Sequence, residues 1–242
     1  KYIVMESYEK YRGNMYNTKN DRVKKTMNLL KGETINKYEK NVNSIIDIGI
    51  GRGTDLKYYV NTNVRRIVGI EPSKESFLTA INRLKSIRRQ NKLYGVKVNL
   101  LNGVGEKSWK NGTAGLDSNS KSNFKHIFQK QRFSADAINL FATMHYMMNT
   151  ETDFTRLLNN IDRHLNSKGI VIIICLNGEK LHQLLKKNKD SYSIKDSEGD
   201  VMYEIKSKYD KKPELYGSKI EVYFKGVYGL DKGIEENIVM TK

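Results

Sequence analysis

The sequence contains one cysteine, no long apolar run and few acidic residues for its size. The single thiol, Cys175, cannot hold the fold together by an intrachain disulfide, so we expect stability to come from packing and the compartment to be reducing. No apolar stretch approaches the ~20 residues that a membrane-spanning helix needs, so we expect no membrane partner. Asp and Glu number 27 against 43 Lys and Arg, which gives a formal net charge of +16 at pH 7.

This surplus of positive charge predicts a polyanionic partner, with RNA or DNA as the natural class. Cations cluster at residues 83–89, 186–189 and 206–212, and the last cluster includes a tyrosine. Such clusters can track a phosphate backbone. They can equally be solvated faces of helices, so both interpretations stay open.

Three closely spaced glycines follow a strand-like segment. Gly49, Gly51 and Gly53 leave the turn without side chains, so a ligand can approach the backbone, and Glu71 about twenty residues later can bind a ribose diol. A strand-to-helix turn can also need glycine for steric reasons alone. The G-x-G-x-G spacing and the nearby Asp55 depart from the dinucleotide-binding pattern. An acidic residue at the turn suits a cation, so S-adenosylmethionine fits better than NAD.

Apolar runs alternate with amphipathic stretches along the chain, which is typical of an α/β protein. Ser73 is a suitable N-cap, and the apolar residues after it recur at helical spacing. From Val201 onward, alternating tyrosine, isoleucine and valine predict antiparallel strands. We expect strands at residues 44–48, 66–70, 96–101, 135–141 and 170–176, and helices that begin near residues 54, 73, 152 and 177.

A chain of 242 residues with 38% hydrophobic residues can bury the core of one enzyme-sized domain. Within residues 1–242 we expect an N-terminal helical segment at residues 1–40. Residues 103–134 begin with Gly, Asn, Ser and Lys in little periodicity, which predicts a mobile surface insertion. The chain starts without methionine and stops soon after a strand-like segment. We therefore expect a piece of a longer protein, truncated at its C-terminal end.

Five sequence blocks occur in the order DIGIGRGTDLKYY, VGIEPS, FATMHYM, LLNNIDRHLNSKGIVIIICLNGEKL and LYGSKIEVYFKGVYG. Together they resemble the mRNA cap guanine-N7 methyltransferases, in particular the methyltransferase domain of capping enzymes of large DNA viruses. The first block is shared by many methyltransferases, whereas the later blocks are more specific in combination. The resemblance implies a doubly wound, mostly parallel sheet of the class I S-adenosylmethionine-dependent methyltransferase type, with an antiparallel C-terminal portion. It also implies S-adenosylmethionine as donor and the capped 5′ end of RNA as acceptor.

For the donor, the resemblance implies that the three glycines line the methionine part, with Asp55 beside them. Glu71 would hold the ribose hydroxyls with its two carboxylate oxygens. The family commonly has glutamine where this chain has Phe141, and it often has an acidic residue for the adenine amino group near Asn102. We therefore expect one donor contact to be lost and another to be replaced by Asn102 or by backbone groups. The remaining donor contacts implied by the resemblance are Lys24, Asp47, Val104 and Tyr146.

For the acceptor, the resemblance places His145 against the guanine of the cap and Glu236 at the guanine edge, with Glu235 as the alternative. Guanine N7 is already a nucleophile and a methyl sulfonium is an activated electrophile, so no acid–base residue and no metal are required. We expect catalysis by positioning through His145, Tyr146 and Glu236. A final strand and a cap-contacting tyrosine are expected beyond residue 242. The further cap contacts implied by the resemblance are Asn20 and Asp21.

We therefore expect an enzyme that transfers a methyl group from S-adenosylmethionine to guanine N7 of the 5′ GpppN cap of mRNA, as one domain of a capping enzyme. The expected partners are capped RNA, other domains of the enzyme and a stimulatory subunit. A viral enzyme of this kind would act in the host cytoplasm or in the virion.

Two alternatives stay open. One is a methyltransferase for another RNA or for a small molecule, which would lack a guanine-sized pocket at His145, Tyr146 and Glu236. The other is a non-catalytic, methyltransferase-like RNA-binding subunit. The glycines together with Asp55 and Glu71 argue against it, because a pocket without a function has no physical need for that set.

Overall fold

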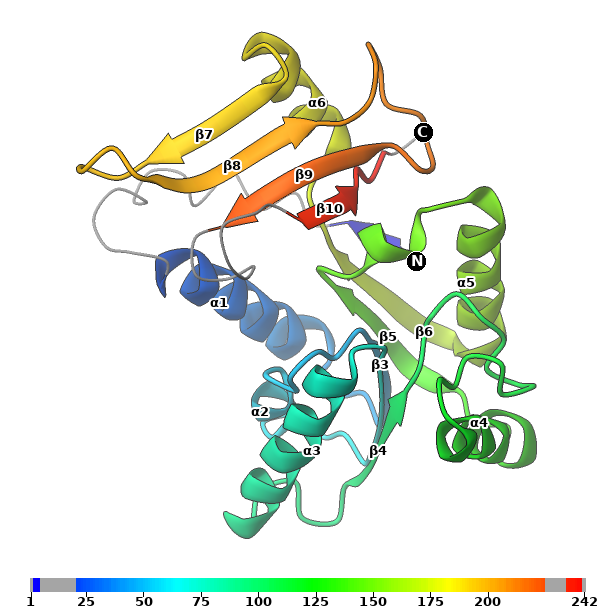
Figure 1. Cartoon of the computed structure of the whole chain (residues 1–242). Coiled ribbons are helices and arrows are strands. Elements are labelled where there is room, and N and C mark those ends of the chain that lie inside the picture. Colours follow the sequence, from blue (N-terminus) through cyan, green and yellow to red (C-terminus); the bar gives the residue numbers. More distant parts are fainter. Residues whose placement is uncertain (1, 5–20, 225–233, 241–242) are drawn as a thin grey trace. The chain divides into compact units, whose positions relative to one another are not determined.

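A computed structural model describes residues 2–4, 21–224 and 234–240 of the chain (Figure 1). The described residues form two compact units. Unit 1 comprises residues 2–4, 28–143 and 152–174, and unit 2 comprises residues 21–27, 144–151, 175–224 and 234–240.

Unit 1 is built on a parallel sheet of six strands in the order β1-β6-β5-β2-β3-β4. Apolar residues form the majority in β2, β3 and β5, which are buried over almost their whole length, as in parallel sheets covered on both faces. The chain order reverses between β2 and β5, which are neighbours in the sheet. The strands are β1 (Tyr2–Val4), β2 (Ser44–Ile48), β3 (Arg66–Glu71), β4 (Lys97–Asn102), β5 (Ala135–Phe141) and β6 (Leu165–Ile174).

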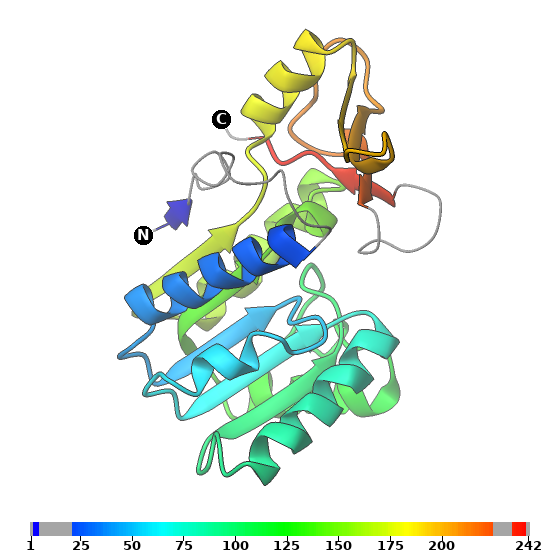
Figure 2. The same ribbon diagram turned by 90° about the vertical axis from the view of Figure 1, so that its left-hand side faces the viewer.

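Helices cover both faces of this sheet (Figures 1 and 2). The part of α1 in unit 1 lies on one face with α2 and α3, and α4 and α5 lie on the other. This arrangement confirms the predicted doubly wound fold. Oγ of Ser73 accepts a hydrogen bond from Ser76 N at 3.3 Å, which confirms the predicted N-cap. The helices are α1 (Asp21–Tyr38), α2 (Leu56–Tyr59), α3 (Lys74–Arg89), α4 (Ser118–Phe124) and α5 (Glu151–His164), with a π-helical turn, η2 (Lys125–Lys130), after α4.

Residues 103–134 differ from the mobile surface insertion expected from their composition. The side chains of Trp109 and Phe124 are fully buried, and the Trp109 ring packs against Phe128 and His164 with centroid distances of 5.1 and 5.6 Å. A β-bridge joins Gly103 to residue 115, and α4 and η2 complete the segment. Aromatic side chains at irregular spacing therefore anchor this segment in the core of unit 1.

Unit 2 contains a short 3-10 helix, η3 (Met144–Met147), and an antiparallel sheet in the order β10-β9-β8-β7. This sheet confirms the antiparallel strands predicted after Val201. Leu181 and Leu185 of α6 pack with apolar residues of the sheet, including Ile205 and Val222. The remaining elements are α6 (Gly178–Lys187), β7 (Ser191–Lys195), β8 (Val201–Ser207), β9 (Lys219–Phe224) and β10 (Ile234–Asn237).

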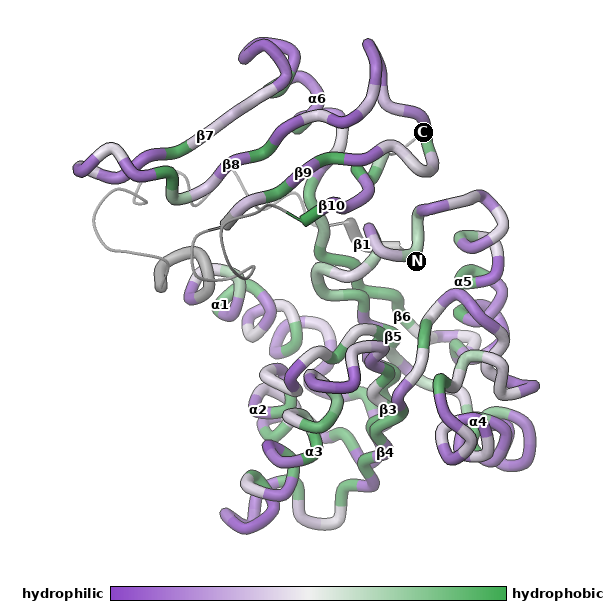
Figure 3. The backbone as a smooth tube through the Cα atoms, viewed as in Figure 1, coloured by the Kyte–Doolittle hydropathy of each residue, from purple (hydrophilic) through white to green (hydrophobic). Residues whose placement is uncertain are grey.

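Hydropathy follows this architecture (Figure 3). The parallel strands β5 and β6 are hydrophobic, whereas the outer helices alternate between hydrophobic and hydrophilic residues. Within the described part of the chain, no helix combines the length and the apolar composition needed to cross a lipid bilayer.

Candidate active site

Three glycines form the turn that follows β2 at the carboxyl edge of the parallel sheet. Gly49, Gly51 and Gly53 have φ angles of +75°, +57° and +68°, a region that L side chains rarely adopt. A Cβ atom on Gly49 would lie 2.2 Å from Cγ2 of Thr143, so a side chain does not fit there. A Cβ atom on Gly51 would meet open space, with its nearest neighbour at 4.0 Å. The backbone at Gly51 therefore leaves room for a ligand.

Glu71 ends β3 next to this turn, and two backbone groups hold its carboxylate. Oε2 accepts a hydrogen bond from Gly51 N at 2.9 Å, and Oε1 accepts one from Ser73 N at 2.8 Å. The residue is buried, and burial raises the pKa of Glu71 while the two hydrogen bonds oppose that rise. Each oxygen keeps a further lone pair, so the carboxylate can still accept from a ribose diol.

Asp55 follows the glycine turn and forms a partly buried ion pair with Lys31 of α1. Oδ2 of Asp55 lies 2.9 Å from Nζ of Lys31, and the two side chains are 3% and 16% exposed. The same ammonium group lies 5.8 Å from the ring centroid of Phe141 at the carboxyl end of β5. Lys31 thus lies where the chain order reverses between β2 and β5, the place at which open α/β sheets bind ligands.

Asp47 lies in the core just before the glycine turn. It is 1% exposed and accepts a hydrogen bond from the Tyr59 hydroxyl at 2.8 Å, and that hydroxyl accepts one from Asn139 at 3.0 Å. Burial raises the pKa of Asp47, and it raises the pKa of the fully buried Glu39 to about 8. The carboxylate of Asp47, a predicted donor contact, is therefore engaged within the protein by Tyr59.

Asn102 and Val104 lie at the end of β4 and just after it, where the adenine contact was predicted. Nδ2 of Asn102 donates hydrogen bonds to the carbonyl oxygens of Glu71 and Pro72 at 2.9 and 3.0 Å. The backbone N–H of Val104 donates to the Ala114 carbonyl at 3.0 Å. Both donors are used within the protein, and the side-chain oxygen of Asn102 is an acceptor of the kind that an adenine amino group needs.

The predicted contacts nearest the N-terminus have no described side chain. Asn20 lies outside the described residues, and the side chains of Asp21 and Lys24 do as well, although their backbones belong to α1. Their roles stay predictions. Lys31 was not predicted. It lies seven residues after Lys24, on the same face of one helix, and this spacing is the sequence signal that could have identified it.

In unit 2, three predicted residues form one cluster, although Tyr146 and Glu236 are 90 positions apart in the sequence. Nε2 of His145 lies 3.6 Å from Oε1 of Glu236, and the Tyr146 hydroxyl donates to the same oxygen at 3.4 Å. The rings of His145 and Tyr146 have centroids 4.0 Å apart. Tyr146 is 48% exposed, whereas Glu236 is 6% exposed. The cluster therefore joins a buried carboxylate to an accessible aromatic ring.

Asn237, the neighbour of Glu236 in β10, ties this cluster to η3. Its Nδ2 donates hydrogen bonds to the His145 carbonyl at 2.6 Å and to Oδ1 of Asn149 at 3.0 Å. Nζ of Lys219 donates to the same Asn149 oxygen at 2.7 Å. Oδ1 of Asn237 and Nε2 of His145 are buried and have no hydrogen-bond partner among the residues that the structure describes. Buried polar atoms of this kind are costly unless a ligand satisfies them.

Burial sets the protonation states in this cluster. It lowers the pKa of His145 to about 4, so the imidazole is neutral near pH 7 and its contact with Glu236 is not an ion pair. Burial raises the pKa of Glu236 to about 6, against the hydrogen bond from Tyr146, which lowers it. Glu236 is therefore mainly ionised at pH 7 and is a hydrogen-bond acceptor.

A family model of the mRNA (guanine-N(7))-methyltransferase domain matches residues 3–232 of the chain. The chain belongs to the mRNA (guanine-N7)-methyltransferase family. This finding confirms the resemblance drawn from the five sequence blocks. It also confirms the predicted enzyme class and the predicted donor, S-adenosylmethionine.

Two relatives of this guanine-N7 methyltransferase domain are viral. Over 208 residues it is 26% identical to the "Probable mRNA-capping enzyme" of Acanthamoeba polyphaga mimivirus, covering 81% of this chain and 18% of the relative. Over 151 residues it is 28% identical to the "mRNA-capping enzyme" of African swine fever virus (isolate Pig/Kenya/KEN-50/1950), covering 60% of this chain and 16% of the relative. The matched region is thus less than a fifth of the length of either relative.

The fold of the methyltransferase domain is shared with a solved structure. An S-adenosylmethionine-dependent methyltransferase from Clostridium acetobutylicum ATCC 824 matches it with a TM-score of 0.52 at 17% identity, covering 90% of this chain and 75% of that chain. This likeness confirms the predicted fold class of the class I methyltransferases.

Proposed function

We propose that the chain transfers the methyl group of S-adenosylmethionine to guanine N7 of the 5′ GpppN cap of mRNA, as one domain of a larger capping enzyme. The convergence of His145, Tyr146 and Glu236 in unit 2 carries the assignment of guanine as acceptor. The relatives are capping enzymes several times longer than the matched region, so the cap itself would be made by other domains. Capped RNA is then the substrate partner, and host cytoplasm or virion is the place of action.

Unit 1 would bind the donor at the carboxyl edge of its sheet. The open backbone at Gly51 would take the methionine part, and the fixed carboxylate of Glu71 would accept from the two ribose hydroxyls. The pair of Asp55 and Lys31 offers one negative and one positive group, which complement the ammonium and carboxylate of an amino acid. Asn102 would accept from the adenine amino group through its side-chain oxygen.

Unit 2 would bind the guanine. The ionised carboxylate of Glu236 can accept hydrogen bonds from the N1–H and the exocyclic amino group of guanine, which are the two donors on that edge. The exposed ring of Tyr146 offers a surface for stacking. Nε2 of His145 has no hydrogen-bond partner among the described residues and could bond the base as donor or acceptor, according to its tautomer.

The reaction requires correct alignment of the two substrates and no proton transfer. The lone pair of guanine N7 forms the new N–C bond to the methyl carbon while the C–S bond breaks, and its electron pair returns to sulfur. The products are S-adenosylhomocysteine and an N7-methylguanine that carries the positive charge. No proton moves. The protein therefore supplies a nearby negative charge and the alignment of guanine N7, the methyl carbon and sulfur. Glu236 would stabilise the cationic product.

The test is methyl transfer from labelled S-adenosylmethionine to RNA that ends in an unmethylated GpppN cap. Digestion of the product identifies the labelled base. We expect the label in N7-methylguanine, none in uncapped RNA, and a loss of transfer in Glu236→Ala. Equal labelling of uncapped RNA would contradict the proposal in favour of another acceptor. Binding of S-adenosylhomocysteine without transfer to either RNA would contradict activity of this chain by itself.

A further inference from the structure

A segment without acidic residues runs from α3 into β4. Between Glu75 and Glu106 the sequence holds six lysines and arginines and not one aspartate or glutamate. Five of these cations are exposed in the structure, and Tyr94, whose side chain is 92% exposed, stands among them in the sequence. We call this set the α3 basic surface. It consists of Lys85, Arg88, Arg89, Lys92, Tyr94 and Lys97.

The backbone of this surface is shaped to present Tyr94 outward. Asn91 and Leu93 both adopt φ angles of +55°, which cost an L residue roughly 1–2 kcal/mol each. Leu93 is 6% exposed and anchors the loop in the core, and Nη2 of Arg88 donates to the Val96 carbonyl at 3.4 Å across the loop. The loop therefore has a strained backbone that buries Leu93 and exposes the ring of Tyr94, and an ordinary solvated helix end does not require such strain.

The cations of this surface differ from Lys206 and Lys208 of unit 2. In unit 2, Nζ of Lys206 lies 2.7 Å from Glu204 and Nζ of Lys208 lies 2.7 Å from Glu221, so those charges are neutralised. Among the residues that the structure describes, no carboxylate pairs with a cation of the α3 basic surface. Its positive charge is therefore available to an external polyanion.

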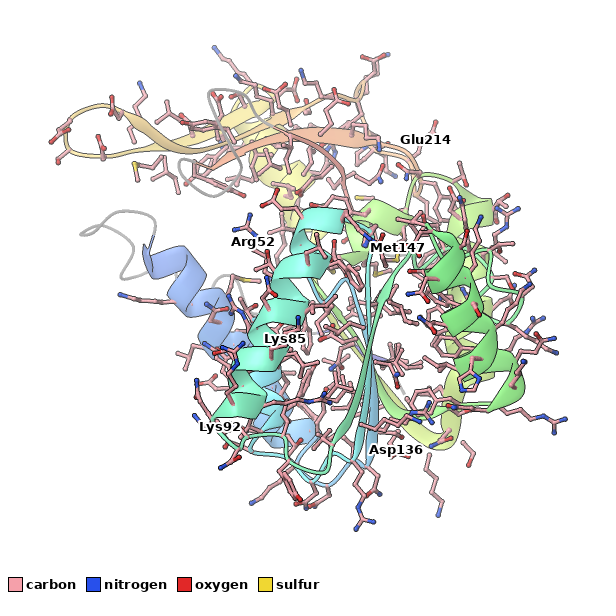
Figure 4. All side chains as sticks on the ribbon, turned by 60° about the horizontal axis from the view of Figure 1, so that its bottom comes forward. Arg52, Lys85, Lys92, Asp136, Met147 and Glu214 are labelled. Carbon is pink, nitrogen blue, oxygen red and sulfur yellow. The ribbon has the colours of Figure 1, made fainter. Side chains whose placement is uncertain are left out.

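The surface lies at the far end of α3 from the glycine turn (Figure 4). At the near end, Arg52 of the turn pairs with Glu75 at 3.0 Å. At 1.5 Å per residue, the helix from Glu75 to Arg89 spans about 21 Å. A single-stranded RNA of several nucleotides can cover that distance, whereas one nucleotide cannot.

We propose that the α3 basic surface binds single-stranded RNA downstream of the cap, with its cations on phosphates and Tyr94 stacked on a base. An exposed aromatic ring among unpaired Lys and Arg side chains fits single-stranded nucleic acid, because each base offers a face for stacking and each linkage one negative charge. The identity of this RNA as the capped transcript rests on the proposed function. The site itself lies outside the residues that bind donor and guanine.

The experiment compares methylation of a cap dinucleotide with methylation of a capped RNA of about 30 nucleotides, a length well beyond a single-strand site. The test variant is Lys85→Glu/Lys92→Glu, and the control with the same change of charge is Lys186→Glu/Lys187→Glu at the exposed end of α6. We expect the test variant to raise KM for the long RNA only and to lower the slope of log affinity against log salt by about 2. Tyr94→Ala should weaken binding of the long RNA about tenfold, and Tyr94→Phe should not.

Each other outcome has a distinct meaning. Equal effects of the test and control pairs would overturn the proposal in favour of bulk charge. Unchanged affinity for the long RNA in the test pair would overturn it and leave an acidic protein surface as the candidate partner. Failure of the parent chain to methylate the cap dinucleotide would contradict the proposed function, while direct binding of the uncapped RNA would still decide whether this surface binds RNA.

Discussion

Two regions differ in how far hydrogen bonds within the protein satisfy their polar groups. One is the glycine turn of unit 1. The other is the cluster of His145, Tyr146, Glu236 and Asn237 in unit 2, which we call the guanine cluster. Around the turn, both carboxylate oxygens of Glu71 accept backbone hydrogen bonds, and Asp55 is paired with Lys31. In the cluster, Nε2 of His145 and Oδ1 of Asn237 are buried and accept or donate no hydrogen bond within the described part of the chain. The carboxylates of Glu71 and Asp55 are thus held by groups of the protein, whereas the cluster leaves two polar atoms for a ligand to satisfy.

The largest expected effect is on the turn. Gly49→Ala combines a left-handed backbone with a Cβ atom 2.2 Å from Thr143, so we expect a loss of about 3–5 kcal/mol in the free energy of unfolding and no measurable binding of S-adenosylhomocysteine. Gly95→Ala is the matched control, because Gly95 has a φ of +72° but nothing within 4 Å of an added Cβ. Denaturant unfolding and calorimetry measure both variants. Similar losses in the two would show that strain alone, without the contact to Thr143, explains the glycine.

The next effect concerns the ion pair beside the turn. Lys31→Met leaves the buried carboxylate of Asp55 unpaired and should cost about 3 kcal/mol of stability. The double variant Lys31→Met/Asp55→Asn should recover most of that stability while donor binding stays weak. Thermal unfolding and binding of S-adenosylhomocysteine separate the two consequences. Full recovery of donor affinity in the double variant would mean that the pair is only structural.

The guanine cluster should respond to pH through the carboxyl group of Glu236. The pKa of Glu236 is raised to about 6, so the carboxylate protonates and loses its acceptor function as the pH falls through that value. The imidazole of His145, with a pKa lowered to about 4, stays neutral across the same range. We expect kcat/KM for a capped RNA to fall about tenfold from pH 7 to pH 5 and the fall to vanish in Glu236→Gln. A pH dependence that persists in Glu236→Gln would assign the titration to another group.

The smallest effect is expected at Tyr146. The hydrogen bond from its hydroxyl to Glu236 is long, at 3.4 Å, so Tyr146→Phe should change kcat/KM by no more than about threefold, while the retained ring still stacks. The pKa of Glu236 should rise in this variant, because the hydrogen bond lowers it in the parent. Tyr146→Ala should be clearly worse in a cap-binding assay. Equal losses in the two variants would place the function in the hydroxyl and not in the ring.

Local patterns predicted much of unit 1. The strands at residues 44–48 and 135–141 were predicted with their observed bounds, because mostly apolar runs mark buried parallel strands, and Ser73 was predicted as an N-cap from its short side chain. Contacts between residues far apart in the sequence were not predicted by these local patterns. Nothing in the composition of residues 103–134 indicated that Trp109 would anchor that segment in the core. The division into two units was also not predicted, because it depends on contacts across the whole chain.

The candidate site shows the same difference between local sequence patterns and long-range contacts. The glycines, Glu71, His145 and Glu236 stand in recognisable blocks, so their positions were named from the sequence alone. Lys31 and Asn237 act through side chains that meet residues 24 and 92 positions away, respectively, and a single sequence does not report such contacts. The α3 basic surface was visible in part, as a cluster of cations, but its lack of acidic partners in space was not.

The central claim is that unit 1 binds the donor and unit 2 binds the guanine through separate residues. Calorimetry of S-adenosylhomocysteine and of a GpppG cap analogue with the parent chain, Glu71→Ala and Glu236→Ala tests it most directly. We predict that Glu71→Ala loses the first ligand and keeps the second, and that Glu236→Ala does the reverse. Loss of both ligands in each folded variant, or loss of the cap analogue only in Glu71→Ala, would contradict the claim.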